Sequence, residues 1–333
     1  MPTRTPRTEQ AYRERARQVA EAANAAAGRK LTAVELVQAL STRKLAPASF
    51  RQVRAALVFT MGELMLRNPA QAKELNAAIA LLREARPKKL SDGVLRTSAS
   101  KQKTAVEADL KRVCHAALAT DTDNAEILVA LLECGQLSGA RLVEWPSAEF
   151  GPSDAAGFAW QLTLVNGKHG NGRAHGHCRT LRWQTLPAAL VVRMRFWIAA
   201  AKQAAATDRY ATLLDTLEAL LRRLTTSLFP RRRTRPTVSS ARHAAAARFK
   251  AAYVESKSSE DDKRLGRAIV AALLGHATDA TASSHYARAR AGSSRFPVPA
   301  PDPDEVRRIR RRFSAPQHRT RSTPAPGNAD QTS

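Results

Sequence analysis

Apolar residues recur at helical spacing along most of this chain. In the stretch "ASFRQVRAALVFTMGELMLRN", the apolar residues Phe50, Val53, Leu57 and Met61 fall roughly on one face of a helix. Alanine, leucine, glutamate and arginine dominate the surrounding sequence, and these residues favour helices. The pattern predicts a block of helices from about residue 9 to residue 85.

Capping residues indicate where two helices begin and where one of them ends. Thr32 precedes the apolar stretch "AVELVQALSTRKL" and Glu35 follows three residues later, which is the spacing of a capping box. Ser258 and Asp261 have the same spacing ahead of "EDDKRLGRAIVAALL", and Gly275 follows that segment. We therefore predict one helix that begins after Thr32 and another that begins after Ser258 and ends at Gly275.

The middle of the chain departs from helical spacing. Helices are predicted at about 101–119 and 123–135, and a stretch rich in β-forming residues follows them. In "GFAWQLTLVNGKHGNGRAHGHCRTLRW" such residues flank a glycine-rich turn, which predicts a β-hairpin with strands near 157–166 and 177–184. Helical spacing then resumes. The predicted fold class is mainly α with a small β-sheet or hairpin.

Composition divides the chain into two domains, a linker and a tail. The segment 86–100 carries Pro, Gly, Ser and basic charge, which is typical of a linker. It separates a helical N-terminal domain, residues 1–85, from a second domain, residues 101–291, that contains the hairpin. Residues 292–333 are rich in Pro, Ser and Arg, so we expect a largely disordered tail in which "PDEVRRIRRRF" forms a brief basic helix.

Basic residues greatly outnumber acidic ones. The chain has 54 Lys and Arg against 29 Asp and Glu, a net charge of +25. This excess suits a polyanion such as nucleic acid, although ribosomal, histone-like and membrane-surface proteins are also basic. The sequence contains no run of about 20 apolar residues, and its start lacks the apolar core of a signal peptide. We therefore expect a cytoplasmic, nucleoid-associated protein that does not bind a membrane.

The hairpin turn contains His169, His175 and His177, which raises the question of a metal site. Cys178 is the only sulfur nearby, and the three cysteines have neither zinc-site nor disulfide-framework spacing. The sequence has no nucleotide-binding loop and no nucleophile elbow, and carboxylates are too sparse in the basic regions for a two-metal nuclease. We predict no metal and no cofactor, and we expect the turn, with Arg173, to contact DNA phosphates.

Metal-free chemistry at a DNA phosphodiester needs a nucleophile, cations that bind the non-bridging oxygens, and a proton donor. A tyrosine hydroxyl, the planar fork of arginine and a lysine or histidine suit these tasks. Taken singly, each candidate has an ordinary structural reading, such as a surface arginine, a solvated lysine, a helix-dipole partner or a core-edge aromatic residue. Their combination in this order favours a catalytic set: Arg141, Lys168, Arg242, His276 and Tyr286.

The order of "RLVEW", a hairpin lysine, "SARH", "LLGH" and "HY" resembles the catalytic domain of the tyrosine recombinases, the phage-integrase family. The most specific piece is "LLGHATDATASSHYARAR", which looks like the family's LGH box followed by its nucleophilic tyrosine. The resemblance implies that Arg141 and Arg242 bind the phosphate as a clamp. It implies that Lys168 is the general acid, that His276 binds the scissile phosphate and that Tyr286 is the nucleophile.

Further positions match the family or depart from it. Glu144, in Arg-x-x-Glu spacing, looks like the acidic residue that supports the first arginine. Ser239 stands where the family usually has a histidine or lysine, and His243 partly compensates from another helical face. The chain between Arg242 and His276 is longer than usual, which implies an insertion around "VESKSSEDD". The stretch "GQLSGARLVEW" is a loose version of the family's Gly-Leu-Arg turn.

The resemblance implies a two-domain clamp around duplex DNA, made of a helical core-binding domain and a mixed α/β catalytic domain. It implies a site-specific recombinase or integrase of a mobile element, which cuts and rejoins DNA through a 3′-phosphotyrosine intermediate. Four protomers would assemble on two DNA attachment sites, and an accessory directionality factor is a candidate partner. The basic run "PRRRTRP" adds candidate DNA-binding residues, namely Arg231, Arg232, Arg233 and Arg235.

Two other functions use the same scaffold. The first is a catalytically weak or inactive DNA-binding protein, which Ser239 and the long spacing after Arg242 favour. The second is a type IB topoisomerase-like enzyme, which shares the chemistry but does not bring two sites together. A generic basic packaging protein would account for the charge but not for the ordered set of motifs.

Overall fold

The computed structural model describes residues 4–86, 107–167, 174–277 and 294–314. Backbone contacts divide the chain into two compact units. The described residues of the first unit are 4–86, 107–128 and 214–240, and those of the second are 129–167, 174–213, 241–277 and 294–314. Most of the predicted linker lies outside the described residues. Two segments predicted as parts of the second domain, 107–128 and 214–240, are grouped with the first unit.

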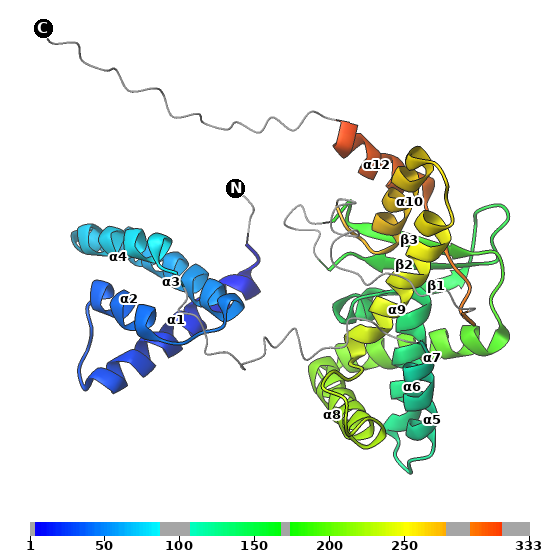
Figure 1. Ribbon diagram of the computed structural model, residues 1–333, viewed down its shortest axis with the longest axis horizontal. Helices are drawn as coiled ribbons and strands as arrows, with labels where there is room; N and C mark the ends of the chain where they lie inside the picture. The colour runs from blue at the N-terminus through cyan, green and yellow to red at the C-terminus, as the bar shows by residue number, and fades with distance from the viewer. Residues whose placement is uncertain (1–3, 87–106, 168–173, 278–293, 315–333) are drawn as a thin grey trace, which may run out of the picture. The chain divides into compact units, whose positions relative to one another are not determined.

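Four α-helices form the N-terminal part of the first unit, as the apolar spacing predicted. They are α1 (Pro6–Ala27), α2 (Ala33–Thr42), α3 (Pro47–Arg67) and α4 (Ala72–Glu84), with a short 3-10 turn, η1 (Pro69–Gln71), before α4 (Figure 1). The predicted capping box is present at the start of α2. The Thr32 hydroxyl accepts the amide of Glu35, and the Glu35 carboxylate accepts the amide of Thr32.

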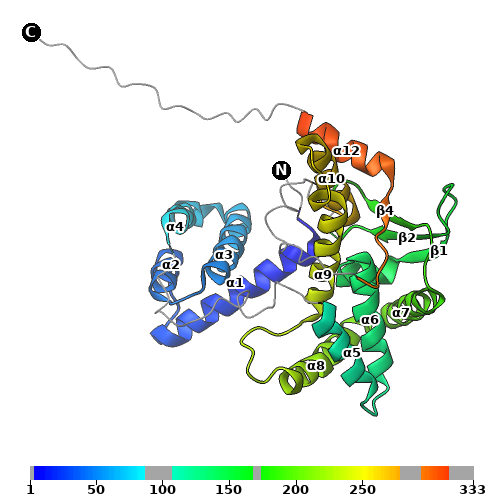
Figure 2. The same ribbon diagram turned by 45° about the vertical axis from the view of Figure 1, so that its right-hand side comes forward.

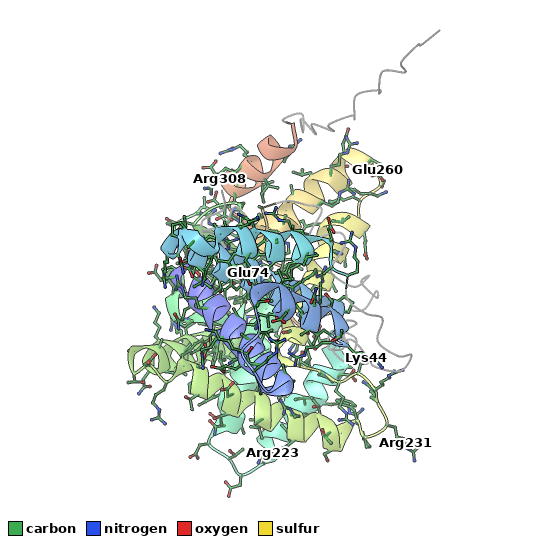
Figure 3. All side chains as sticks on the ribbon, turned by 90° about the vertical axis from the view of Figure 1, so that its left-hand side faces the viewer. Lys44, Glu74, Arg223, Arg231, Glu260 and Arg308 are labelled. Carbon is green, nitrogen blue, oxygen red and sulfur yellow. The ribbon has the colours of Figure 1, made fainter. Side chains whose placement is uncertain are left out.

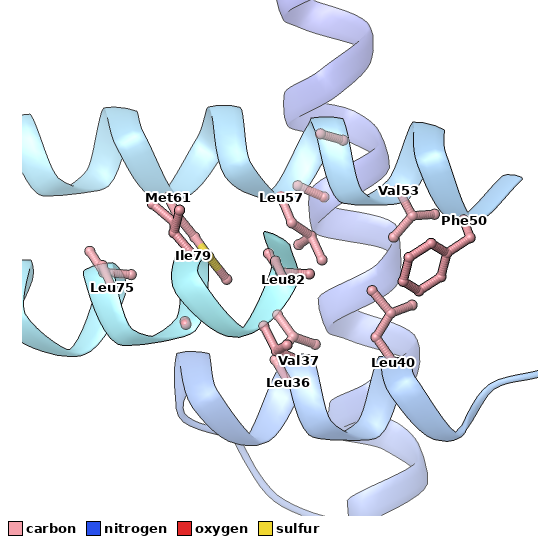
Figure 4. Packing of buried hydrophobic residues seen from close by; sticks show 13 residues of the cluster. Leu36, Val37, Leu40, Phe50, Val53, Leu57, Met61, Leu75, Ile79 and Leu82 are labelled. Carbon is pink, nitrogen blue, oxygen red and sulfur yellow. The ribbon is translucent and has the colours of Figure 1, made fainter. Parts of the chain in front are cut away.

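The predicted apolar face of α3 lies in the centre of the N-terminal core. Phe50, Val53, Leu57 and Met61 are all buried, and they pack with apolar side chains of α2 and α4 (Figure 4). Burying a large apolar side chain contributes about 1.5–3 kcal/mol relative to leaving it exposed. These four positions therefore account for much of the free energy that holds the helices together.

The remainder of the first unit includes α5 (Glu107–Leu118), the C-terminal half of α8 (Tyr210–Leu228) and the loop after it. Arg232 in this loop donates to the carboxylate of Asp109 at 2.5 Å, and its guanidinium lies 4.4 Å from the centroid of the Phe229 ring. Asp109 is buried in α5, so the ion pair fixes the loop against that helix, while the cation–π contact holds the Arg232 guanidinium on the Phe229 ring.

The second unit combines helices with a small antiparallel sheet. Its described helices begin with α6 (Asn124–Ser138) and η3 (Leu142–Ser147), continue with α7 (Ala188–Ala206), α9 (Val238–Lys250) and the π-helical turn η5 (Ala251–Glu255), and end with α10 (Glu260–Leu273) and α12 (Pro303–Ser314). Helices α6 and α9 begin in residues grouped with the first unit. The described fold is mainly helical, as predicted.

The sheet contains four antiparallel strands in the order β1-β2-β3-β4. Figure 2 labels three of them, β1, β2 and β4. They are β1 (Glu149–Pro152), β2 (Trp160–Val165), β3 (Cys178–Trp183) and β4 (Ala300–Pro301). Strands β2 and β3 pair from Trp160 opposite Trp183 to Val165 opposite Cys178. The predicted hairpin is thus confirmed, and β1 and β4 extend it to a sheet.

The C-terminal residues 294–314 are folded, and the prediction of a largely disordered tail was wrong for them. Strand β4 pairs with β3, and Arg182 donates to Asp302 at 2.9 Å. Helix α12 buries Val306 and Ile309 against alanines of α10. The predicted basic helix is confirmed, but composition did not reveal that two apolar residues one turn apart suffice to pack it. The rest of the predicted tail lies outside the described residues.

Glu305 of α12 is a buried carboxyl, only 4% exposed. Its Oε1 accepts the backbone N–H of Thr180 at 2.9 Å, and its Oε2 lies 3.8 Å from Nε2 of His175. Burial, together with the nearby charge of Asp302, raises the pKa of Glu305 to about 8 despite the Thr180 hydrogen bond. The carboxyl is therefore protonated at neutral pH, and its contact with His175 is not a salt bridge.

The free energy of unfolding is expected to decrease as the pH rises from about 4.5 to about 8, because of Glu305. In this window the unfolded chain ionises the carboxyl, whereas the folded chain keeps it protonated. The unfolded state then binds fewer protons, so stability falls by at most about 1.4 kcal/mol per pH unit. Urea denaturation at several pH values between about 5 and about 8 checks this. Glu305→Gln should remove this part of the pH dependence, and equal slopes in both proteins would contradict the assignment.

Helix α10 begins one residue later than predicted. Its N-cap is Ser259, whose hydroxyl accepts the amide of Asp262 at 3.0 Å, so the predicted Ser258–Asp261 cap was wrong by one position. With Ser259 as the cap, all three acidic residues Glu260, Asp261 and Asp262 lie in the first turn, where negative charge is favourable.

Gly266 in α10 lies against the backbone of η5. A Cβ atom at this position would lie 1.8 Å from the carbonyl oxygen of Tyr253 and 2.6 Å from its carbonyl carbon. The hydroxyl of Tyr253 in turn donates to the carbonyl of Pro299 at 2.9 Å, so the π-helical turn is held from two sides. This close backbone contact requires glycine in α10.

Gly266→Ala is expected to lower the free energy of unfolding by about 2–3 kcal/mol, because the methyl group forces the two backbone segments apart. Gly62→Ala is a matched control in the interior of α3, where a Cβ would meet nothing within 4 Å. That substitution should stabilise the protein by about 0.5–1 kcal/mol. Chemical denaturation measures both changes, and a neutral or stabilising Gly266→Ala would refute the close contact.

Candidate active site

Glu144 lies fully buried in η3 and binds the segment around the first predicted clamp arginine. Its carboxylate accepts both the backbone N–H and the Nη1 of Arg141, each at 2.7 Å. It also accepts the backbone N–H of Gly167 at 3.1 Å. Gly167 directly precedes Lys168, the predicted general acid, which lies outside the described residues. Glu144 therefore orients Arg141 and holds the backbone of Gly167, the residue before Lys168.

Arg179 of β3 is fully buried beside Glu144, and none of the sequence motifs pointed to it. Its Nη2 donates to Glu144 Oε2 and its Nη1 donates to Asn166 Oδ1, both at 2.6 Å. Its Nε donates to the carbonyl oxygen of Leu273 at 3.1 Å. One guanidinium thus joins η3, the residue after β2 and the end of α10.

The electrostatics of Glu144 follow from this pairing. Burial alone would raise the pKa of its carboxyl, because the charged form loses its hydration. The charge and hydrogen bond of Arg179, helped by the charges of Arg242 and Arg141, outweigh burial and hold the pKa well below its usual range. The carboxylate therefore stays ionised and offsets part of the positive charge around it.

Arg242 extends from α9 to the backbone of two other segments. It donates to the carbonyl oxygen of Gly139, after α6, and its Nη2 donates to the carbonyl oxygen of Leu274 at 2.8 Å. The same nitrogen lies 3.3 Å from Nε2 of His276. The alternative of an ordinary surface arginine is therefore wrong for Arg242. The second predicted clamp arginine and the predicted phosphate-binding histidine are neighbours.

His276 follows α10 and is 5% exposed. The preceding Gly275 has a left-handed backbone with φ of 65°, so it ends the helix as predicted. A Cβ on Gly275 would lie 2.2 Å from Oδ1 of Asn166 and 2.8 Å from Nη1 of Arg179. Glycine is needed here both for its φ angle and because the chain passes directly over the Asn166–Arg179 hydrogen bond.

Four of the predicted residues thus gather in one cluster within the second unit: Arg141, Glu144, Arg242 and His276. They come from η3, α9 and the segment after α10. Arg141 binds Glu144, Arg242 contacts His276, and the charges of both arginines lower the pKa of Glu144. Two guanidinium groups beside a histidine form a site for an anion such as a phosphate group. The cluster therefore has the chemistry of a phosphate clamp.

The other predicted catalytic residues cannot be placed in this cluster. Lys168 and Tyr286 lie outside the described residues, as does Arg173, so their predicted roles stay predictions. Ser239 is exposed in the first turn of α9. His243 follows Arg242 on the same helix and is half-buried, and one residue along a helix turns the side chain to a different face.

The basic run after α8 divides into structural and exposed arginines. Arg232 pairs with Asp109, as described above, and Arg235 donates to the carbonyls of Phe229 and Pro230 and to the Thr226 hydroxyl. The loop conformation therefore depends on these two arginines. Arg231 and Arg233 are exposed, and the prediction of DNA contacts applies most directly to them.

The described residues contain no group of three or more His, Cys, Asp or Glu side chains arranged to hold a metal ion. Of the hairpin histidines, His175 is buried with its Nε2 3.3 Å from the carbonyl oxygen of Ala272, and His177 is exposed. Among the helices of the described segments, none has the length and apolar character that a membrane span requires.

No protein-family model matches this chain, and no curated protein matches it either.

Proposed function

We propose that this protein is a site-specific DNA recombinase of the tyrosine type, acting for a mobile element. The observation that carries the proposal is the convergence of Arg141, Glu144, Arg242 and His276 from distant parts of the sequence. A merely basic DNA-binding surface has no need to bury a carboxylate beneath one arginine and to place a histidine against another. An enzyme that stabilises the negative charge on a phosphate in the transition state of phosphoryl transfer needs such a preorganised cationic site.

In the proposed reaction the Tyr286 hydroxyl loses its proton to water as its oxygen attacks a scissile phosphodiester. The new bond joins phosphorus to the tyrosine oxygen, and the bond to the 5′-oxygen breaks, which leaves a 3′-phosphotyrosine and a 5′-hydroxyl. Lys168 gives its proton to the departing 5′-oxygen, while Arg141 and Arg242 neutralise the non-bridging oxygens and His276 donates a hydrogen bond to one of them. A 5′-hydroxyl of another strand reverses the step, so the bond energy is conserved.

The environments of the other tyrosines support Tyr286 as the nucleophile. Tyr210 donates its hydroxyl to the carbonyl of Leu142 at 2.6 Å, and burial raises its pKa. Tyr253 donates to the carbonyl of Pro299, and burial raises its pKa as well. Tyr12 packs edge-to-face on Phe59 in the N-terminal core. A buried hydroxyl that already donates to a backbone carbonyl is a poor nucleophile, which argues against Tyr210 and Tyr253. Of the two remaining tyrosines, Tyr12 belongs to the N-terminal helices and Tyr286 follows the segment that carries His276.

The proposal requires duplex DNA with attachment sites as the substrate and four protomers assembled on two duplexes. It requires no metal and no nucleotide, and an accessory directionality factor is a candidate partner. The net charge of +25 supports DNA as the substrate, because phosphate contacts supply much of the affinity of such proteins.

The test is the formation of a covalent protein–DNA complex. The full-length protein is incubated without metal with nicked suicide duplexes that carry the attachment site, which is sought as a repeat in the DNA flanking the gene. The proposal expects an SDS-resistant adduct, and mass spectrometry of its peptides should place the phosphate on Tyr286. Without any adduct on the correct site, the recombinase proposal fails.

A second candidate function is a non-catalytic DNA-binding protein on the same scaffold. Ser239, at the position where tyrosine recombinases usually carry a histidine or lysine, favours it. This candidate expects sequence-specific binding with no adduct under any condition. Relaxation of any supercoiled plasmid by a monomer would instead favour a type IB topoisomerase-like enzyme.

A further inference from the structure

A groove of about 380 Å³ lies in the first unit, between the C-terminal half of α8 and the segment that leads into α9. It takes no residue from the Arg141–Arg242 cluster. Its polar lining consists mainly of arginines and hydroxyl-bearing residues, and the six that matter here are Arg222, Arg233, Arg235, Thr226, Thr237 and Ser239.

The charge of the groove comes from three arginines. Arg222 and Arg233 are exposed, and among the described residues neither guanidinium forms a hydrogen bond or ion pair. Arg235 is half-buried, and its three donors to Phe229, Pro230 and Thr226 hold it rigidly in the wall. Glu218 also lines the groove, and its carboxylate reduces the positive charge of the three arginines without cancelling it.

The end of the groove is the start of α9. Thr237 and Ser240 cap this helix, since the Thr237 amide donates to the Ser240 hydroxyl at 2.9 Å and the Ser240 amide donates to the Thr237 carbonyl at 2.8 Å. The first amides of a helix have no acceptor within the helix, and its dipole adds positive potential there. Arginines, hydroxyls and a helix start thus face the same space from two elements.

We propose that this groove binds one phosphodiester of a DNA strand, other than the phosphate that is cut. The guanidinium fork matches two oxygens of a phosphate, and the hydroxyl of Ser239 or Thr237 can donate to a third. A polar groove at the surface also admits a continuous strand, because the polymer can enter and leave through its open sides. The choice of DNA as the source of the phosphate rests on the proposed function, whereas the anion chemistry rests on the groove alone.

The role of Ser239 changes under this proposal. A serine at the start of α9 suits the binding of a backbone phosphate in the groove, for which a hydroxyl donor is sufficient. The same position then contributes to DNA binding in this protein, and a proton-transfer role is not needed from it. The serine at position 239, where the family usually has a histidine or lysine, is thus explained by its role in binding a DNA phosphate.

The test compares two double variants of the full-length protein, each of which loses two positive charges. Arg222→Gln/Arg233→Gln removes the free arginines of the groove. Arg209→Gln/Arg223→Gln is the control, with one substitution directly before α8 and one on α8, at residues that neither line the groove nor belong to the predicted DNA-binding residues. Arg209 and Arg223 are both exposed, and Figure 3 labels the side chain of Arg223.

Binding of a labelled duplex of arbitrary sequence is measured by fluorescence anisotropy over a range of salt concentrations, so that no cleavage takes place. The groove variant should lose at least about tenfold in affinity at low salt. It should also lower the slope of log K against log salt by about 1 more than the control does. Glu218→Gln should act in the opposite direction and tighten binding.

The outcomes separate this proposal from the recombinase proposal. Equal losses in the two double variants overturn the groove and leave the chemistry at Tyr286 untouched. A larger loss in the groove variant supports the groove, even where no covalent adduct forms. If the unaltered protein binds no DNA, both proposals are wrong.

Discussion

Tyr286→Phe is expected to abolish the covalent protein–DNA adduct completely, while binding of the attachment site is retained. The phenyl ring lacks the oxygen that would bond to phosphorus, so no other change in the site can restore the bond. Binding should persist because the proposed phosphate clamp, Arg141 and Arg242, keeps its own contacts to Glu144, Gly139 and Leu274. A gel of the SDS-treated reaction and an anisotropy titration measure the two properties separately.

Two other tyrosines provide matched controls for this result. Tyr210→Phe and Tyr253→Phe each remove a hydroxyl that donates to a backbone carbonyl, so each should lower stability by about 0.5–1.5 kcal/mol. Both variants should still form the adduct at temperatures where they are folded. An adduct that persists in Tyr286→Phe and disappears in one of the other variants would assign the nucleophile to that residue instead.

The apolar spacing predicted most of the fold, because its signals are local. The face of Phe50, Val53, Leu57 and Met61 needs only a helix to bring it together, and the structure buries all four. The hairpin needs only a turn between two stretches of β-forming residues, and β2 and β3 pair directly. Each of these predictions depends on residues that are close in sequence.

The predictions that failed depend on contacts across long stretches of chain. The C-terminal segment is rich in charge, and its composition alone favours disorder. It folds because Asp302 meets Arg182 and because Glu305 meets the backbone of Thr180, more than a hundred residues earlier. A segment whose composition favours disorder can still fold when a sheet edge and a helix elsewhere in the chain offer it contacts.

The sequence predicted four residues of the candidate cluster but not the buried arginine, Arg179, that binds its carboxylate. The resemblance to the recombinase motifs supplied Arg141, Glu144, Arg242 and His276, which do gather, but it gave no reason to examine Arg179. One local signal was available. In β3, every second residue points to the buried face, so Arg179 lies on the same face as Leu181 and Trp183. A buried arginine at such a position requires a buried carboxylate, and Glu144 is that partner.

Arg179→Met is expected to lower the free energy of unfolding by about 3–5 kcal/mol, because it leaves the carboxylate of Glu144 buried without its main partner. It also leaves Asn166 Oδ1 and the carbonyl of Leu273 without this donor. Arg182→Met is the control on the other face of β3. Its ion pair with Asp302 is partly exposed, so its loss should cost no more than about 1 kcal/mol.

The pH dependence of the variant distinguishes a lost charge partner from lost packing. With Arg179 present, the pKa of Glu144 is depressed, so its contribution is present above the pKa of the unfolded chain and is lost only as the pH falls through the folded value. Without Arg179, burial dominates and raises that pKa. Arg179→Met should therefore regain stability relative to wild type as the pH falls through this raised pKa.

The double variant Arg179→Met/Glu144→Gln completes the thermodynamic cycle. Its loss of stability should be smaller than the sum of the two single losses, because the buried charge and its partner are removed together. The relative gain at low pH should also disappear, since no carboxyl remains to be protonated. Additive losses, or a pH profile shared by Arg179→Met and Arg182→Met, would mean that Arg179 acts through packing alone and that Glu144 depends on Arg141 for its charge.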